Sequence, residues 1–165
     1  MKQLFVVRHA KSSWENPGQS DFDRALNERG LKDAPMMAKR LQLQGIFPDA
    51  IVSSPAVRAL TTARFFAAQF GLGKNEIVQV ERLYHASVDT FYDVISNEFL
   101  DAWDRVFLFS HNPGITYFVN SIGVAELDNM PTCGIFGVRA NIGQWKDFGE
   151  AEKRFILFDY PKNTF

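Results

Sequence analysis

Cysteine is almost absent from this 165-residue sequence, in which Cys133 is the only one. A single cysteine cannot form an internal disulfide bond, which favours a reducing compartment. No apolar run approaches the ~20 residues of a membrane-spanning helix, and the N-terminal MKQLFVVRH is too short and too soon charged for a signal peptide. The sequence therefore predicts a cytoplasmic protein without a membrane segment.

Net charge is also nearly absent, because 18 Lys and Arg face 19 Asp and Glu. This balance gives no global attraction to nucleic acid or to an anionic membrane, so any anion binding must be local. The hydrophobic fraction of 46%, with 16 Phe, is sufficient for a sizeable core. No repeat or linker divides the chain, and we expect one domain over residues 1–165.

Three short apolar segments run into polar residues. Leu4–Val7 are followed by Arg8 and His9, residues 49–54 (DAIVSS) end in hydroxyls, and residues 104–111 (DRVFLFSH) end in a histidine. Continuous apolar runs of this length are typical of strands that are buried on both faces of a parallel sheet.

Helical periodicity lies between these strands. Residues 27–44 place Leu31, Ala34, Ala38 and Leu41 on one face, and residues 55–71 do the same with Ala59, Ala63, Phe66 and Phe70. Pro35 predicts a kink or a late start in the first helix. Ser54 and Asn112 are expected N-caps, with Pro55 and Pro113 opening the helices that follow them.

The alternation of strands and helices predicts an α/β fold: a single three-layer α/β/α domain with a mostly parallel central sheet. Residues 132–139 and 153–160 are expected to form a hairpin at one edge of that sheet. Parallel sheets place ligands at the carboxyl ends of their strands, where Arg8, His9, Arg58 and His111 would meet. Two histidines and two arginines near helix starts indicate an anion site, and phosphate fits them best.

The motifs RHAKSSWENPG, DFDRALNERG, SSPAVRALTTA and SHNPGI, in this order, resemble the histidine phosphatase superfamily, the phosphoglycerate mutase-like proteins. Within it they are most similar to phosphohistidine phosphatases of the SixA type. The resemblance implies that His9 is the nucleophile, and that Arg8, Arg58 and His111 bind the phosphate. Arg24 would be a further contact, and Ser12 either donates a hydrogen bond or stabilises the turn.

The implied function is hydrolysis of phosphohistidine on a partner protein, in signal transduction, through a phosphohistidine enzyme intermediate. It requires no metal ion or other cofactor, because arginines can neutralise the phosphate charge. His85 stands where mutase-like members have a catalytic glutamate. The usual proton donor is therefore missing, and His85, Glu81 and Asp89 are candidate substitutes.

The sequence departs from the pattern of the superfamily at two further positions. Ala10 stands where most members have glycine, and Asn16 is shifted by one position from the asparagine of mutase-like members.

Four alternative interpretations of the sequence remain. Cys133 and Arg139 have the spacing of a cysteine phosphatase loop, and His9, His85 and His111 could ligate zinc, although neither fits its surroundings well. The pocket could recognise phosphorylated partners without catalysis, or the substrate could be a small phosphorylated metabolite. The short segment 84–105 leaves little chain for a lid, which favours a phosphate carried by a protein.

Overall fold

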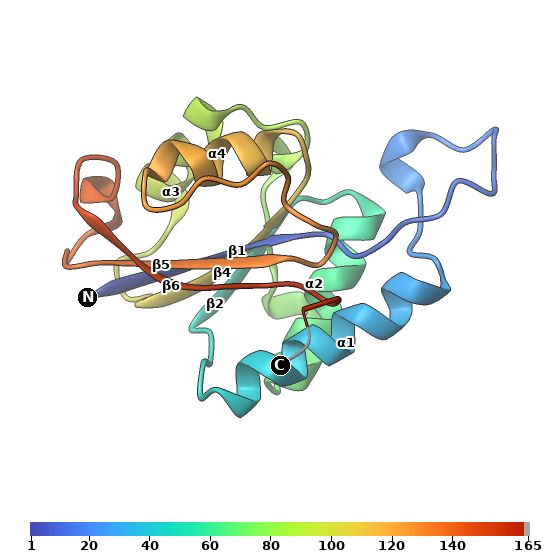
Figure 1. Ribbon diagram of the computed structural model, residues 1–165, viewed down its shortest axis with the longest axis horizontal. Coiled ribbons are helices and arrows are strands. Elements are labelled where there is room, and N and C mark those ends of the chain that lie inside the picture. Colours follow the sequence, from blue (N-terminus) through green and yellow to red (C-terminus); the bar gives the residue numbers. More distant parts are fainter. Residues whose placement is uncertain (164–165) are drawn as a thin grey trace.

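Six strands form one sheet, in the spatial order β3-β2-β4-β1-β5-β6, in the computed structural model, which describes residues 1–163 (Figure 1). The strands are β1 (Lys2–Arg8), β2 (Ala50–Ser53), β3 (Val78–Gln79), β4 (Arg105–Ser110), β5 (Ile135–Ala140) and β6 (Lys153–Asp159). β1 pairs in parallel with β4, and β2 with β4 and β3, whereas β5 runs antiparallel to β1 and β6. The mostly parallel sheet with a C-terminal hairpin at one edge is confirmed.

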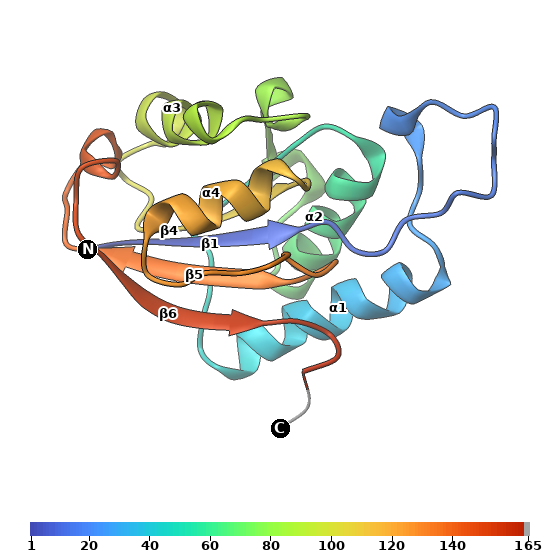
Figure 2. The ribbon, with the colours of Figure 1, turned by 45° about the horizontal axis from the view of Figure 1, so that its top comes forward.

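Two helices cover each face of the sheet, α1 (Glu28–Leu43) and α2 (Val57–Gln69) on one side, α3 (Val88–Glu98) and α4 (Gly114–Ile122) on the other (Figures 1 and 2). Side chains alternate along β1, so Leu4 and Val6 pack into the core beneath α3 and α4, while Phe5 and Val7 pack beneath α1 and α2. All four are fully buried, which explains the apolar run, and the three-layer fold is confirmed.

Single 3-10 turns complete the chain: η1 (Asp21–Asp23), η2 (Lys74–Glu76), η3 (Glu81–Leu83) and η4 (Trp145–Asp147). Among the described residues, no helix has the length and apolarity needed to cross a membrane.

α1 starts earlier than Pro35 predicts, at Glu28. The side chain of Asn27 caps this start by accepting a hydrogen bond of 2.9 Å from the backbone N–H of Gly30. The helix continues through Pro35 because its inner face, including Ala34 and Ala38, is buried against the sheet. The expected late start is therefore wrong, and Leu31 is not on the core face, since it is 47% exposed.

Two predicted caps are wrong. α2 begins at Val57 with Ala56 at the N-cap position, and α4 begins at Gly114 with Pro113 there. The hydroxyl of Ser54 instead hydrogen-bonds to His111, and the side-chain oxygen of Asn112 accepts from Thr116. Both polar side chains hold the loops at the strand ends, where the candidate site lies.

Candidate active site

A cavity of about 250 Å³ lies where β1 and β4 end and α2 begins. It is lined by Arg8, His9, Lys11, Ser12, Trp14, Asp21, Arg24, Arg58, His85, His111, Asn112 and Thr132. The nucleophile, the phosphate-binding residues and His85 that sequence analysis proposed are therefore brought to one cavity, whereas the alternative proton donors Glu81 and Asp89 are not. We call it the phosphate pocket.

His9 is held from two directions by backbone hydrogen bonds. Its N–H donates to the carbonyl of Ser110 at 3.2 Å, and its carbonyl accepts from the N–H of Cys133 at 3.0 Å. The ring Nδ1 lies 2.7 Å from the carbonyl of Ala10, an acceptor, so Nδ1 carries the proton. Nε2 then carries the lone pair, which accepts a long hydrogen bond of 3.4 Å from Nε of Arg58. A neutral imidazole held this way can act as a nucleophile.

The electrostatics keep His9 neutral. Burial is the main cause that lowers its pKa, the hydrogen bond to Ala10 acts in the opposite direction, and the positive charges of Arg58, Arg8 and Arg24 also lower it, with a net pKa of about 3.

His111 lies beside His9, with 5.2 Å between the ring centroids. The hydroxyl of Ser54 accepts from the N–H of Ala56 at 3.3 Å and is hydrogen-bonded to Nε2 of His111 at 2.7 Å. If Ser54 is the donor in this contact, Nδ1 of His111 carries the proton and can donate to a bound oxyanion. Burial is the main cause that lowers the pKa of His111, followed by the charges of His9 and Arg58, so this ring too is neutral.

Two buried side-chain nitrogens in the described part of the chain have no hydrogen-bond partner, Nε of Arg8 and Nδ1 of His111. Both belong to residues that line the phosphate pocket. A buried donor without a partner costs about 1–3 kcal/mol, and an oxyanion in the pocket would satisfy donors of this kind. The other end of the Arg8 side chain is fixed by a 2.8 Å hydrogen bond from NH1 to the carbonyl of Met130.

Asp21 was missed by sequence analysis, although its carboxylate links two arginines of the pocket to each other and to Tyr84 beside it. Its carboxylate accepts hydrogen bonds from Arg58 NH2 at 3.0 Å, Arg24 Nε at 3.1 Å and the Tyr84 hydroxyl at 2.6 Å. Its backbone carbonyl also accepts from Arg58 NH1 at 2.6 Å. Both terminal nitrogens of the Arg58 guanidinium, NH1 and NH2, therefore bind Asp21, and Nε of Arg58 faces His9.

The carboxyl group of Asp21 is held ionised. Partial burial raises its pKa, but the hydrogen bonds from Tyr84 and Arg58 outweigh that effect and hold the pKa well below its usual range. Asp21 therefore positions arginines and is not a proton donor at neutral pH.

Arg24 and Ser12 support each other at the rim of the pocket. NH1 of Arg24 donates to the hydroxyl of Ser12 at 2.8 Å, and the ring of Trp14 lies 3.5 Å from the Arg24 guanidinium carbon. Gly30 allows this loop to approach α1, because a Cβ at that position would lie 2.2 Å from the carbonyl oxygen of Lys11.

His85 is the one of the three candidate proton donors that lines the pocket; Glu81 and Asp89 are exposed outside it. Its ring lies against that of Tyr84, with 3.9 Å between centroids, and its backbone φ of 59° is in the left-handed region. Asp21 is the single carboxylate in the pocket lining within residues 1–163, so no carboxylic acid replaces the missing glutamate there.

The cysteine alternative does not fit the structure. Residues 135–140 form β5, and Arg139, near its far end, does not line the pocket; burial raises the pKa of the Cys133 thiol. No group of three metal-ligating side chains occurs within the described residues, so His9, His85 and His111 do not form a zinc site.

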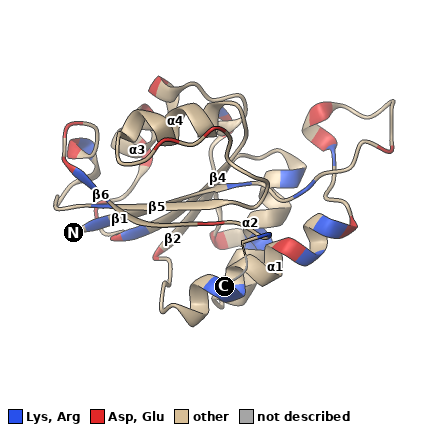
Figure 3. Ribbon diagram, in the orientation of Figure 1, with Lys and Arg blue, Asp and Glu red and all other residues tan. Residues whose placement is uncertain are grey.

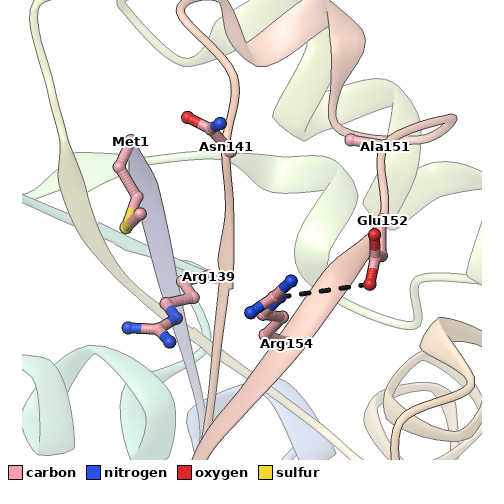
Figure 4. Close-up of a pocket in the computed structure, with 6 residues that line it drawn as sticks. All are labelled: Met1, Arg139, Asn141, Ala151, Glu152 and Arg154. Carbon is pink, nitrogen blue, oxygen red and sulfur yellow. Dashed lines mark ion pairs between the residues drawn. The ribbon is translucent and has the colours of Figure 1, made fainter.

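A larger cavity of about 590 Å³ lies at the opposite end of β1 (Figure 4). It is lined by Met1, Arg139, Asn141, Ala151, Glu152 and Arg154. Both arginines are exposed and Glu152 lies 4.0 Å from Arg154, so water and this carboxylate already satisfy their charge. It contains no buried polar group and no nucleophile, and we assign the chemistry to the phosphate pocket.

The three-layer fold and the histidine-lined pocket place the chain among α/β proteins whose site lies at the carboxyl ends of parallel strands. Residues 4–112 match the family model of the histidine phosphatase superfamily (branch 1). The chain belongs to this superfamily and is a phosphatase of it.

Known relatives agree with this assignment. The SixA structure from Agrobacterium tumefaciens is 27% identical, with a TM-score of 0.80 over 97% of this chain and 98% of that one. A protein histidine phosphatase SixA complexed with tungstate shares the fold, with a TM-score of 0.81, 20% identity and coverage of 96% and 97%. Phosphoserine phosphatase 1 of Hydrogenobacter thermophilus is 30% identical over 109 residues, 65% of this chain and 49% of that protein.

Proposed function

We propose that the protein hydrolyses phosphohistidine on a partner protein through a covalent intermediate on His9. The observation that carries this is the pair of buried side-chain nitrogens without a hydrogen-bond partner, Nε of Arg8 and Nδ1 of His111, in the pocket where Nε2 of His9 faces Arg58. The likeness to SixA of Agrobacterium tumefaciens supports the choice of substrate.

In the proposed first step, Nε2 of His9 attacks phosphorus in line. The bond from phosphorus to the leaving imidazole breaks, and that nitrogen takes a proton. Arg8, Arg58 and His111 hold the three equatorial oxygens throughout, with Arg24 and Ser12 at the rim. In the second step a water molecule attacks phosphorus, and the bond between phosphorus and Nε2 of His9 breaks. Inorganic phosphate leaves, and a proton of the attacking water passes to solvent or to His85.

The experiment that tests this function is a substrate panel. Wild-type protein is incubated with a phosphohistidine protein, phosphoserine, aryl phosphate and small sugar phosphates, with the His9→Ala variant in parallel. We expect the phosphohistidine protein to have the highest kcat/KM. Binding of phosphate without turnover of any substrate would instead indicate a recognition module.

A small phosphorylated metabolite is the second candidate substrate. It is favoured by the likeness to phosphoserine phosphatase 1, although that match covers 65% of this chain. Preferential cleavage of phosphoserine in the panel would establish it.

Asp21→Asn is expected to lower kcat by about 10-fold or more and to weaken vanadate binding. The substitution keeps the size of the side chain but removes the charge that turns Arg58 toward His9, and small misplacements of catalytic groups are costly. Steady-state kinetics and vanadate inhibition provide the measurement. Asp23→Asn is the matched control, because the exposed carboxylate of Asp23 accepts a hydrogen bond from Ser20 outside the pocket. Tighter vanadate binding and faster turnover in Asp21→Asn would show that Asp21 competes with substrate for the arginines.

The buried histidines predict an unusual pH dependence. The pKa of His9 is lowered to about 3, so in the substrate-free protein its ring should remain unprotonated, and a competent nucleophile, well below pH 6.5. The His9 and His111 imidazole signals in NMR spectra should therefore show no titration between pH 8 and pH 5. His9→Ala and His111→Ala variants identify the signals. A His9 midpoint near 6.5 would contradict the buried, neutral state.

The same shift has a consequence for stability. The pKa of His9 is about 3 in the folded protein and about 6.5 in the unfolded chain. Above pH 6.5 neither state binds the proton, so the free energy of unfolding is unaffected. As the pH falls from 6.5 toward 3, only the unfolded chain binds the proton, and the free energy of unfolding decreases. Acidification should therefore destabilise the substrate-free protein.

A further inference from the structure

A second cavity, of about 520 Å³, adjoins the phosphate pocket. It is lined by His85, Ala86, Ser87, Val88, His111, Asn112, Pro113, Gly114 and Tyr117. His85, His111 and Asn112 line the phosphate pocket as well, so the two cavities are adjacent. We call the second cavity the side groove.

The side groove differs chemically from the pocket beside it. The phosphate pocket is lined by three arginines, whereas the side-groove lining contains no Lys, Arg, Asp or Glu. Residues 111–125 carry none of these residue types, and the ribbon of α4 is tan throughout in Figure 3. Tyr117 on α4 is nevertheless 63% exposed. A large aromatic side chain left uncovered beside a charged pocket is typical of a contact site for another molecule.

The backbone segments that line the groove are closely packed. Gly114 allows the start of α4 to pack directly on the loop before α3, since a Cβ there would lie 2.1 Å from the carbonyl oxygen of Ala86. Ser87 fixes the start of α3 from the other side, because its hydroxyl accepts a hydrogen bond from the backbone N–H of Thr90 at 3.2 Å.

The geometry of in-line transfer indicates what can occupy the groove. In an in-line transfer the leaving group departs on the side of phosphorus away from the nucleophile, so the molecule that carries the phosphate extends out of the pocket. His85, His111 and Asn112 line both the pocket and the side groove. The side groove is therefore an uncharged surface, next to the pocket, that such a molecule can contact.

We propose that the side groove binds the polypeptide that carries the phosphohistidine, and that Tyr117 packs against an apolar side chain of that polypeptide. The proposal rests on the proposed function and makes Tyr117 a specificity residue for protein substrates. A small phosphate ester fills the pocket and leaves the groove vacant, so the groove favours protein over small substrates.

Tyr117→Ser is expected to lower kcat/KM for a protein phosphorylated on histidine with phosphoramidate by about 5- to 10-fold, mainly through KM, relative to kcat/KM for an aryl phosphate. The quantity measured is the ratio of the two kcat/KM values on one enzyme preparation. Tyr117→Phe should retain the wild-type ratio, because it keeps the ring. Leu43→Ser is the matched control, since Leu43 is 75% exposed on α1, outside both cavities.

An unchanged ratio in Tyr117→Ser, which includes an equal loss on both substrates, would overturn the groove proposal alone, provided that the wild-type enzyme dephosphorylates the protein. A wild-type enzyme that does not dephosphorylate the phosphohistidine protein would instead refute the proposed function itself. A drop in the ratio that also appears in Leu43→Ser would show a general effect of surface polarity and would equally overturn the role of Tyr117.

Discussion

Replacing His9 with alanine is expected to reduce turnover on the order of 10⁴- to 10⁶-fold, the scale seen when a covalent nucleophile is removed. Inorganic phosphate should still bind, because Arg8, Arg58 and His111 keep their positions. The two backbone hydrogen bonds of residue 9 do not involve the ring, so the loop should survive the substitution.

Trapping of the intermediate is the measurement. Brief reaction with ³²P-labelled substrate and an alkaline quench should leave label on wild-type protein that is stable to base and lost in acid, as expected of phosphohistidine. His9→Ala should carry no label, and circular dichroism confirms that it is folded. Acid-stable label, or label that persists in His9→Ala, would refute His9 as the nucleophile.

The parts of this site that could be predicted from the sequence are those that local pattern determines. The apolar run Leu4–Val7 indicates a strand covered on both faces, and the polar residues after it mark the edge where the strand surfaces. The same pattern recurs before Ser54 and before His111. Since carboxyl ends of parallel strands share one edge, the convergence of Arg8, His9 and His111 followed from alternation alone.

The supporting hydrogen bonds could not be predicted this way, because they join distant residues. Asp21 is 37 positions from Arg58, and Ser54 is 57 positions from His111. The one local signal for Asp21 was its spacing of three residues from Arg24. The two N-cap predictions were wrong because other partners use these side chains: Ser54 hydrogen-bonds to His111, and Asn112 hydrogen-bonds to Thr116 and Asn129.

The lack of a carboxylic acid in the pocket leads to the last prediction. Expelling an alkoxide requires a proton in the transition state, and a positioned general acid contributes about 10² to 10⁴ in rate. Asp21 cannot supply that proton, since its carboxyl group is held ionised by Tyr84 and Arg58. An enzyme without a donor should favour leaving groups that depart unaided, such as the imidazole of phosphohistidine, whose bond to phosphorus is labile.

We therefore expect kcat/KM to fall from phosphohistidine protein to aryl phosphate to alkyl phosphate, with the alkyl ester lowest by about 10² or more. His85→Glu should reduce the difference in kcat/KM between phosphohistidine protein and alkyl phosphate, because it returns a carboxyl group to the rim of the pocket. His85→Gln has a side chain of the same length as glutamate but no acidic proton, so it should not reduce that difference. All three substrates are compared on one preparation of each protein, at one pH. Wild-type enzyme that cleaves alkyl phosphate as fast as phosphohistidine protein would show that a proton donor exists, and the exposed residues Glu81 and Asp89, four positions before and after His85, would then be tested as that donor.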